Sequence, residues 1–249
     1  MTVYEKLLMA KEKNGAGYFV LLDPDKRSIE GVIQSVKLYE ESGVDAILIG
    51  GSILFTTEFD EMVKSVKESV NIPVILFPGS GSQLSRYADA VLFMSLISGR
   101  NPHYLIGEQV LSAPIVRELG LEPISTGYML IESGKMTTVE FMSSTRPLPR
   151  DKPEIAVAHA LAAEYLGMKM IYLEGGSGAE LSVPKEIIHA VSQAVSIPII
   201  VGGGIRKAEA AREKVEAGAS FIVTGNILEE KKEASFAKSF VQAVHVKKR

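Results

Sequence analysis

The chain has 249 residues, no cysteine and a formal net charge of −3, from 27 basic and 30 acidic side chains. Without cysteine, disulfides, thiolate catalysis and Cys-ligated zinc are excluded. No basic cluster precedes the tail Lys247–Arg249 and no low-complexity break divides the chain, so we expect one domain over residues 1–249 and no nucleic-acid partner.

Short apolar runs bounded by turn residues alternate with helical patterns along the whole chain. The expected strands are residues 18–22, 46–49, 73–77, 90–94, 123–130, 169–173, 198–201 and 221–224. The expected helices are residues 28–43, 57–69, 102–118, 154–166, 184–195, 207–217 and 234–244. The strand runs are continuously apolar, as burial on both faces requires. This pattern predicts a closed parallel (β/α)8 barrel rather than an open doubly wound sheet.

One helix of the ring is expected to be missing. Residues 72–81 resemble residues 197–205, and residues 88–93 resemble residues 219–224, as in a doubled half-barrel. In the first half of this repeat, the connection between the two strands, Gly79–Asp89, is short and begins with glycine and serine. The third barrel helix is therefore expected to be absent or reduced to a turn. Such a gap leaves apolar barrel surface for a neighbouring molecule or a long ligand to cover.

The N-terminal residues Met1-Thr-Val-Tyr-Glu-Lys6 lack the apolar core of a signal peptide, and no apolar run approaches the length of a membrane span. We therefore expect a cytoplasmic protein. Neither observation excludes contact with a membrane surface, from which a lipid-like substrate would be collected.

Glycine clusters follow the sixth, seventh and eighth expected strands, where barrels hold phosphate. They are Gly175–Gly178 (interrupted by Ser177), Gly202–Gly204, and Gly225 followed by Asn226. Glycine lets backbone amides turn toward an anion, and Asn226 can begin a short helix whose N-terminus favours one. Tight turns are the alternative, but three clusters at these positions favour a phosphate site.

Asp23 and Ser52 follow the first and second expected strands. In the barrel they would lie at the same end as the glycines, on the other side of the opening. A carboxylate beside a hydroxyl suits Mg²⁺, which completes its octahedron with waters and substrate phosphates. The alternative role for Asp23 is to cap the helix that begins near Ser28. Asp25 is nearer to that helix and is the better candidate for the cap.

Glu174 ends the sixth expected strand, directly before its glycine cluster. It is either the partner of a barrel lysine or arginine, or a general base for a hydroxyl on a phosphate-bearing substrate. The histidines 103, 159, 189 and 245 fall in or directly beside expected helices, which favours packing roles. The long segment Glu132–Pro153 is a candidate lid. Its Arg146, Arg150 and Lys152 could reach a diphosphate, although solvated charges are the default.

The chain resembles the geranylgeranylglyceryl phosphate synthases over nearly its whole length. The motifs that carry the resemblance are Leu22-Asp-Pro-Asp-Lys26, Gly50-Gly-Ser52, Tyr172-Leu-Glu-Gly-Gly-Ser-Gly178, Gly202-Gly-Gly-Ile205 and Gly225-Asn226. The resemblance implies a barrel without its third helix. It also implies transfer of a geranylgeranyl group from its diphosphate to the C3 hydroxyl of sn-glycerol 1-phosphate, the first ether bond of archaeal-type lipids.

The resemblance also implies roles for individual residues. Asp23 and Ser52 would hold the Mg²⁺ that binds the diphosphate, and Glu174 would accept the hydroxyl proton. The residues implied to hold glycerol 1-phosphate are Tyr172, Ser177, Gly178, Gly203, Gly204, Gly225 and Asn226. Some members carry lysine where this chain has Leu21. Leu21 and the second glycine after Glu174 resemble the second subgroup, which includes dimers and hexamers.

Two other functions would also use a glycine-rich phosphate site. An isomerase or synthase acting on a phosphosugar would share the glycine clusters, but no paired acid and base stands at opposite strand ends. A catalytically silent barrel that senses a phosphorylated metabolite would keep the glycines and would not need Glu174. Prenyl chain length is not encoded in any motif, although Tyr104 and the loop after the fifth strand are candidates for setting it.

Overall fold

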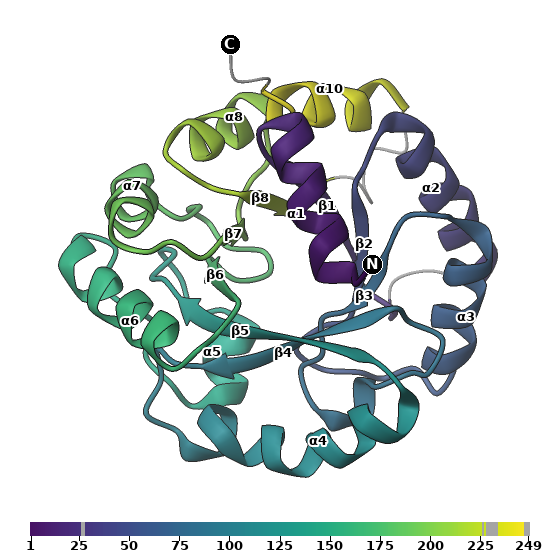
Figure 1. The fold of residues 1–249 in the computed structure, drawn as a ribbon, viewed down its shortest axis with the longest axis horizontal. Helices are drawn as coiled ribbons and strands as arrows, with labels where there is room; N and C mark the ends of the chain where they lie inside the picture. Colours follow the sequence, from purple (N-terminus) through teal and green to yellow (C-terminus); the bar gives the residue numbers. More distant parts are fainter. Residues whose placement is uncertain (26–27, 226, 228–233, 247–249) are drawn as a thin grey trace.

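The computed structural model describes residues 1–25, 28–225, 227 and 234–246. Eight parallel strands pair in sequence order, and β8 closes the barrel on β1 (Figure 1). The strands are β1 (Gly17–Leu22), β2 (Ala46–Ile49), β3 (Val74–Leu76), β4 (Ala90–Leu96), β5 (Glu122–Leu130), β6 (Met170–Glu174), β7 (Ile199–Gly202) and β8 (Phe221–Thr224). The (β/α)8 barrel predicted from the sequence is confirmed.

Apart from α1, which lies across one end, the helices follow one another around the barrel in chain order (Figure 1). They are α1 (Val3–Asn14), α2 (Ile29–Ser42), α3 (Phe59–Ser69), α4 (Glu108–Leu119), α5 (Thr138–Ser143), α6 (Pro153–Tyr165), α7 (Lys185–Ala194), α8 (Ala208–Glu216) and α10 (Ala234–Val244). None of those described is long and apolar enough to cross a membrane.

The expected gap in the ring lies between β3 and β4. The connection there contains only a single 3₁₀ turn, η1 (Gly81–Gln83), where the barrel pattern would place a helix. The prediction that this helix is reduced to a turn is therefore confirmed. No helix of this connection, all of whose residues are described, covers the outer surface of β4 between η1 and α4.

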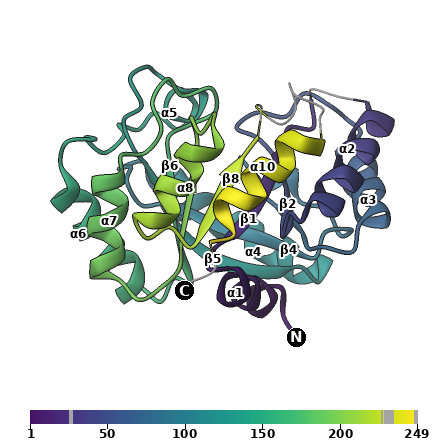
Figure 2. The ribbon, with the colours of Figure 1, turned by 90° about the horizontal axis from the view of Figure 1, so that it is seen from above.

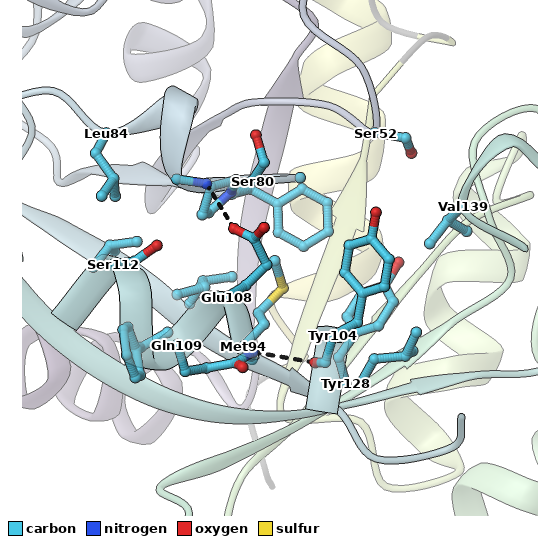
Figure 3. Close-up of a pocket in the computed structure, with 18 of the residues that line it drawn as sticks. Ser52, Ser80, Leu84, Met94, Tyr104, Glu108, Gln109, Ser112, Tyr128 and Val139 are labelled. Atoms are coloured by element: carbon cyan, nitrogen blue, oxygen red, sulfur yellow. Dashed lines mark hydrogen bonds between the residues drawn. The ribbon is translucent and has the colours of Figure 1, made fainter. Parts of the chain in front are cut away.

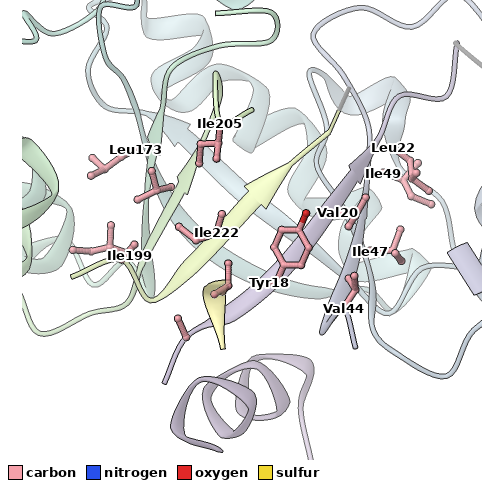
Figure 4. Packing of buried hydrophobic residues seen from close by; sticks show 14 of the residues in the cluster. Tyr18, Val20, Leu22, Val44, Ile47, Ile49, Leu173, Ile199, Ile205 and Ile222 are labelled. Atoms are coloured by element: carbon pink, nitrogen blue, oxygen red, sulfur yellow. The ribbon is translucent and has the colours of Figure 1, made fainter. Parts of the chain in front are cut away.

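Side chains of each strand alternate between two apolar clusters, as the period of a β-strand requires. Along β1, Phe19 packs inside the barrel, whereas Tyr18 and Val20 pack outward against the helices. Figure 4 shows the outward cluster, with Tyr18 and Val20 beside Ile47 and Ile222 of the neighbouring strands. Both faces of the strands are thus buried, which explains why the strand segments read as continuous apolar runs.

Helix α1 was not predicted. It lies across the end of the barrel opposite α5 (Figure 2), where Val3 and Leu7 join the interior cluster. The Glu122 carboxylate, at the start of β5, accepts hydrogen bonds from the backbone N–H groups of Val3 and Tyr4 at 2.5 and 3.0 Å. An acidic group at a helix N-terminus is favourable because it satisfies free N–H groups. Helix α1 thus closes one end of the barrel and leaves the other open.

Two further segments differ from the predicted elements. The helix expected over residues 102–118 begins as a π-helix, η2 (His103–Gly107), and continues as α4. The segment Glu132–Pro153 was predicted as a long loop, but it contains the short helix α5, capped by Thr137. Both segments border the open end of the barrel and shape the site described next.

Candidate active site

A pocket opens at the carboxyl ends of the strands, and we call it the mouth. The predicted site residues that line it are Asp23, Ser52, Tyr172, Glu174, Ser177, Gly178, Gly203, Gly204 and Gly225. The remaining candidate, Asn226, lies outside the described residues. The structure therefore gathers in one pocket groups that are about 200 residues apart in the chain.

Glu174 is the buried acid of the mouth. Its side chain is 5% exposed, and its Oε1 accepts a hydrogen bond of 2.5 Å from the Gly176 N–H. Burial raises the pKa of Glu174 to about 7, although the Gly176 N–H and the neighbouring Tyr172 hydroxyl both act to lower it. No lysine or arginine of the described chain forms an ion pair with this carboxyl. The ion-pair alternative is therefore not supported, and a pKa near neutrality suits a general base.

The Tyr172 hydroxyl stands beside Glu174 with no well-formed hydrogen bond to any described residue. It fits against Gly202 so closely that a Cβ there would collide with the phenol oxygen. Burial is the main cause that raises the pKa of Tyr172, and the Glu174 charge adds to it. A buried polar group without a partner is costly, so this hydroxyl is a ready donor for an oxygen atom of a ligand in the mouth.

The glycine clusters after β6 and β7 lie against each other at the mouth. Gly203 and Gly204 have φ of 82° and 70°, a backbone conformation that residues with a Cβ rarely adopt. The loop after β6 lies directly against them, because a Cβ on Gly204 would approach Ser182 N to 2.9 Å. Backbone groups of the two loops can therefore come close to an anion in the mouth, as in other backbone anion sites.

Asp23 and Ser52 both line the mouth, from the loops after β1 and β2. They provide one carboxylate and one hydroxyl, and no group of three or more acidic or histidine ligands is found among the described residues. Such a sparse oxygen donor set fits Mg²⁺, which keeps several waters and takes the rest of its ligands from substrate phosphates. The chemistry of these residues thus fits the proposed ion.

Asp25 does not have the predicted role. Ser28 caps α2, its side chain accepting from the Gly31 N–H at 3.4 Å. The Asp25 carboxylate instead accepts hydrogen bonds from the N–H groups of Phe55 and Thr56 at 3.0 and 2.7 Å. The prediction failed because the segment 53–56, distant in sequence, offers better donors. Asp25 therefore ties the Asp23 loop to the loop that carries Ser52.

A second cavity, which we call the groove, continues the mouth into the gap left by the missing helix (Figure 3). Its walls are mainly apolar, with Met94 from β4, Leu84 from the β3–β4 connection, and Tyr104 and Ser112 from the η2 and α4 side. The residues that line both cavities are Gly51, Ser52, Phe77, Tyr128 and Val139. A ligand can therefore place a charged end in the mouth and a long apolar tail in the groove.

The side chain of Gln109 fixes η2 on the groove. Its Nε2 donates to the backbone oxygens of Met94 and Tyr104, while its Oε1 is buried without a partner among the described residues. Ser95 of β4 donates to the Leu105 oxygen, also on η2. A π-helix disturbs the regular ladder, and these two side chains supply donors to its carbonyl groups. The position of Tyr104 at the groove therefore depends on Gln109 and Ser95.

The histidines and the loop cations lie elsewhere. His103 pairs with Glu108 at 2.8 Å and His245 with Asp45 at 2.8 Å, and no histidine of the described chain lines the mouth or the groove. Arg150 donates to the backbone oxygens of Glu132 and Ser182. Arg146 and Lys152 do not line either cavity. One basic residue that sequence reasoning missed, Arg206, does line the mouth, and the only signal for it is its place two residues after Gly204.

Comparison with known proteins agrees with this geometry. A profile described as the PcrB family matches residues 8–244. The chain belongs to the PcrB family. This confirms the resemblance drawn from the motifs, since relatives over most of the chain are geranylgeranylglyceryl phosphate synthases.

Two relatives illustrate the similarity. The geranylgeranylglyceryl phosphate synthase of Chitinophaga pinensis is 48% identical over 243 residues, which cover 98% of this chain and 96% of that protein. The synthase of Thermococcus kodakarensis is 51% identical over 213 residues, covering 85% and 84% of the two chains. Each match therefore covers most of the barrel.

Solved structures give the same answer for the fold. The (S)-3-O-geranylgeranylglyceryl phosphate synthase from Thermoplasma acidophilum, in complex with the substrate sn-glycerol-1-phosphate, has a TM-score of 0.93 and 34% identity. It covers 98% of this chain, and 99% of its own chain is matched. Thiamine phosphate pyrophosphorylase from Pyrococcus furiosus, at 16% identity and a TM-score of 0.61, shares the barrel alone.

Proposed function

We propose that this chain is a Mg²⁺-dependent prenyltransferase, a geranylgeranylglyceryl phosphate synthase. It joins geranylgeranyl diphosphate to the C3 hydroxyl of sn-glycerol 1-phosphate and releases diphosphate. The observation that carries the proposal is the continuity of the mouth, with its buried Glu174, and the apolar groove. A phosphosugar isomerase or a phosphate sensor would have no use for that groove.

The acceptor belongs in the glycine side of the mouth. Its phosphate would accept hydrogen bonds from backbone N–H groups near Ser177, Gly178, Gly203, Gly204 and Gly225, with Asn226 beside them in sequence. The unpartnered Tyr172 hydroxyl would donate to an oxygen of the same substrate. Such contacts would bring the C3 hydroxyl near Glu174, where proximity and orientation lower the barrier.

The donor belongs across the mouth and in the groove. Asp23 and Ser52 would hold Mg²⁺, which when bound neutralises charge on the diphosphate. The prenyl chain would lie along Met94, Tyr104 and Val139. Burial of this apolar surface is favourable, at roughly 25 cal/mol per Å².

The bond changes then follow from the positions of the groups. Glu174 accepts the proton of the C3 hydroxyl as the oxygen forms a bond to C1 of the prenyl group. The bond between C1 and the diphosphate oxygen breaks, and its electron pair leaves with diphosphate. A carboxylate with a pKa near 7 can accept this proton and release it to water at neutral pH. Both substrates carry a charged, well-hydrated group, which agrees with the cytoplasmic location expected from the sequence. That location stays a prediction.

Purified protein incubated with Mg²⁺, sn-glycerol 1-phosphate and geranylgeranyl diphosphate tests the proposal, with the ether product detected by mass spectrometry. We expect a product that depends on all three additions. Turnover of a phosphoribosyl substrate without Mg²⁺ would instead support the isomerase class. Phosphate binding by calorimetry with no ether product would support the sensor.

The outer face of η2 and α4 supports a homo-oligomer. Ile106, Val110 and Leu111 are 58, 63 and 66% exposed there, on the side of the barrel where polar residues are expected. A second copy of the chain would cover these side chains, in a dimer or in a hexamer built from dimers. Light scattering should therefore show dissociation of the Val110→Glu variant. Membrane binding through this face would instead appear as cosedimentation of the wild type with lipid vesicles.

A further inference from the structure

Arg206 bridges the two loops that form the phosphate side of the mouth. It stands on the loop after β7, two residues beyond Gly204. Its Nη2 donates to the Ala179 oxygen at 2.6 Å and its Nη1 to the Glu180 oxygen at 3.1 Å, both on the loop after β6. A planar guanidinium suits such a double contact, because its N–H groups point in fixed directions.

The part of the β6 loop that Arg206 holds is the part that carries Ser177 and Gly178. The Ala179 N–H donates to the Gly176 oxygen at 3.1 Å, which closes the turn around them. Gly175 N–H in turn donates to the Gly202 oxygen at 3.0 Å. Arg206 and this backbone bond thus join the two loops at both ends of the turn, so the amides of the two glycine clusters keep a fixed separation.

Arg206 also carries the only positive charge among the described residues that line the mouth. The charged groups that share the mouth with it are the acids Asp23, Asp25 and Glu174. The other N–H groups of its guanidinium have no hydrogen-bond partner among the described residues, since only the contacts to Ala179 and Glu180 are made. Among the described residues that line the mouth, Arg206 is therefore the side chain that offers an anionic ligand both a positive charge and free N–H donors.

We propose that Arg206 positions the phosphate group of the acceptor substrate, both by clamping the β6 loop and by supplying the positive charge on that side of the mouth. This role rests on the proposed function for the identity of the acceptor. The prenyl diphosphate binds across the mouth near Asp23 and Ser52, so Arg206 acts on one substrate and leaves the other unaffected.

Steady-state kinetics of R206Q test the role. Loss of a charged hydrogen-bond donor typically weakens binding on the order of tenfold. We expect the KM for sn-glycerol 1-phosphate to rise by about that factor or more, with kcat and the KM for geranylgeranyl diphosphate within about twofold of wild type. R206K keeps the charge but cannot donate in the same fork, so its KM should lie between those of wild type and R206Q.

Arg150 provides the matched control, because it also donates to two backbone oxygens and one of them, Ser182, is on the same loop. It does not line the mouth. R150Q should leave the KM for glycerol 1-phosphate unchanged. An unchanged KM in R206Q and R206K, or an equal rise in R150Q, would overturn the proposal. If R206Q fails to fold, judged by circular dichroism, R206K and R150Q still decide the comparison.

Calorimetry separates this proposal from the proposed function. Wild-type protein and R206K are titrated with sn-glycerol 1-phosphate alone, without donor or Mg²⁺. Weaker binding in R206K supports the role of Arg206 even if no ether product forms, in which case only the proposed reaction fails. Equal binding by the two proteins contradicts the role of Arg206 whether or not the reaction occurs.

Discussion

The α-carbon of Gly203 faces the carboxylate of Glu174 so closely that a Cβ on Gly203 would collide with Glu174 Oε1. The two residues come from neighbouring strand ends, and the backbone of Gly203 has a φ of 82°. The position of the proposed base is therefore set by a residue without a side chain on the adjacent loop.

Gly203→Ala should lower kcat strongly, because the added methyl group moves the carboxylate. Backbone strain at a positive φ should also cost about 1–3 kcal/mol of unfolding free energy. Gly167→Ala is the matched control, since Gly167 has a φ of 80° with nothing within 4 Å of the added Cβ. The control should lose similar or less stability in urea denaturation and keep its kcat. Equal kcat values for the two variants would contradict the account.

The raised pKa of Glu174 predicts how stability varies with pH. The unfolded carboxyl titrates near its ordinary value of 4.5, whereas the folded one titrates at about 7. Between these values the folded protein holds on Glu174 a proton that the unfolded chain has released, so the contribution of this group to stability is greatest below pH 4.5 and falls as pH rises to 7. The difference corresponds to about 3 kcal/mol.

Denaturant unfolding of wild type and Glu174→Gln across pH 4.5 to 8 measures this effect. Glutamine does not titrate, so the stability of the wild type relative to the variant should decline through this range and then level off. A constant difference would mean that Glu174 ionises at its ordinary pKa when folded. The variant should also lose most of its turnover, because it cannot accept the hydroxyl proton.

Asp25→Ala should weaken Mg²⁺ binding without removing a ligand. Its carboxylate holds the N–H groups of Phe55 and Thr56, which follow Ser52 in the same loop. Loss of hydrogen bonds to a charged acceptor costs about 1.5–3 kcal/mol, so the apparent affinity for Mg²⁺ should fall about tenfold. Calorimetric titration of Mg²⁺ with inorganic diphosphate present gives this affinity without turnover. Ser28→Ala, which removes the α2 cap, should lower stability and leave Mg²⁺ affinity intact.

Ser112→Phe should shorten the prenyl chain that the enzyme accepts. Ser112 is 9% exposed and lines the groove, so a phenyl ring there takes space from the tail. The variant should lose activity with geranylgeranyl diphosphate more than with farnesyl or geranyl diphosphate. Leu111→Phe, at the 66% exposed neighbouring position, should leave the preference unchanged. The same loss with all three donors would place the tail elsewhere.

The fold could be predicted because each strand is a short apolar run that ends in turn residues. The missing helix could be predicted because the linker Gly79–Asp89 is short, begins with glycine and serine, and departs from the internal repeat. Helix α1 was missed because its apolar residues are not confined to one face, Met9 being exposed while Val3 and Leu7 are buried. Thr2 and Glu5 form a capping box that could have indicated it. The π-helix η2 has no distinct pattern, since it depends on donors from Gln109 and Ser95.

The sequence predicts which residues line the site, but it does not predict their pKa values or their contacts with distant loops. Residues that follow barrel strands meet at one end, so the positions of Asp23, Ser52 and Glu174 in the chain are enough to place them together. The pKa of Glu174 depends on burial, which its sequence neighbours do not give. Asp25 and Arg206 act through contacts with loops distant in sequence, to Phe55 and Ala179, and such pairings follow only from the folded chain.

The preference between acceptor enantiomers tests the central claim most directly. The rate of ether formation is measured with geranylgeranyl diphosphate and Mg²⁺, using sn-glycerol 1-phosphate in one series and sn-glycerol 3-phosphate in the other. The two acceptors have the same spacing between phosphate and terminal hydroxyl and differ only in configuration at C2, so a preference requires three points of contact. The glycine loops at the phosphate, Glu174 at the reacting hydroxyl and the Tyr172 hydroxyl at another oxygen would supply them, and the proposed function then predicts much faster reaction of the 1-phosphate. Equal rates, or no ether with either acceptor, would contradict the account.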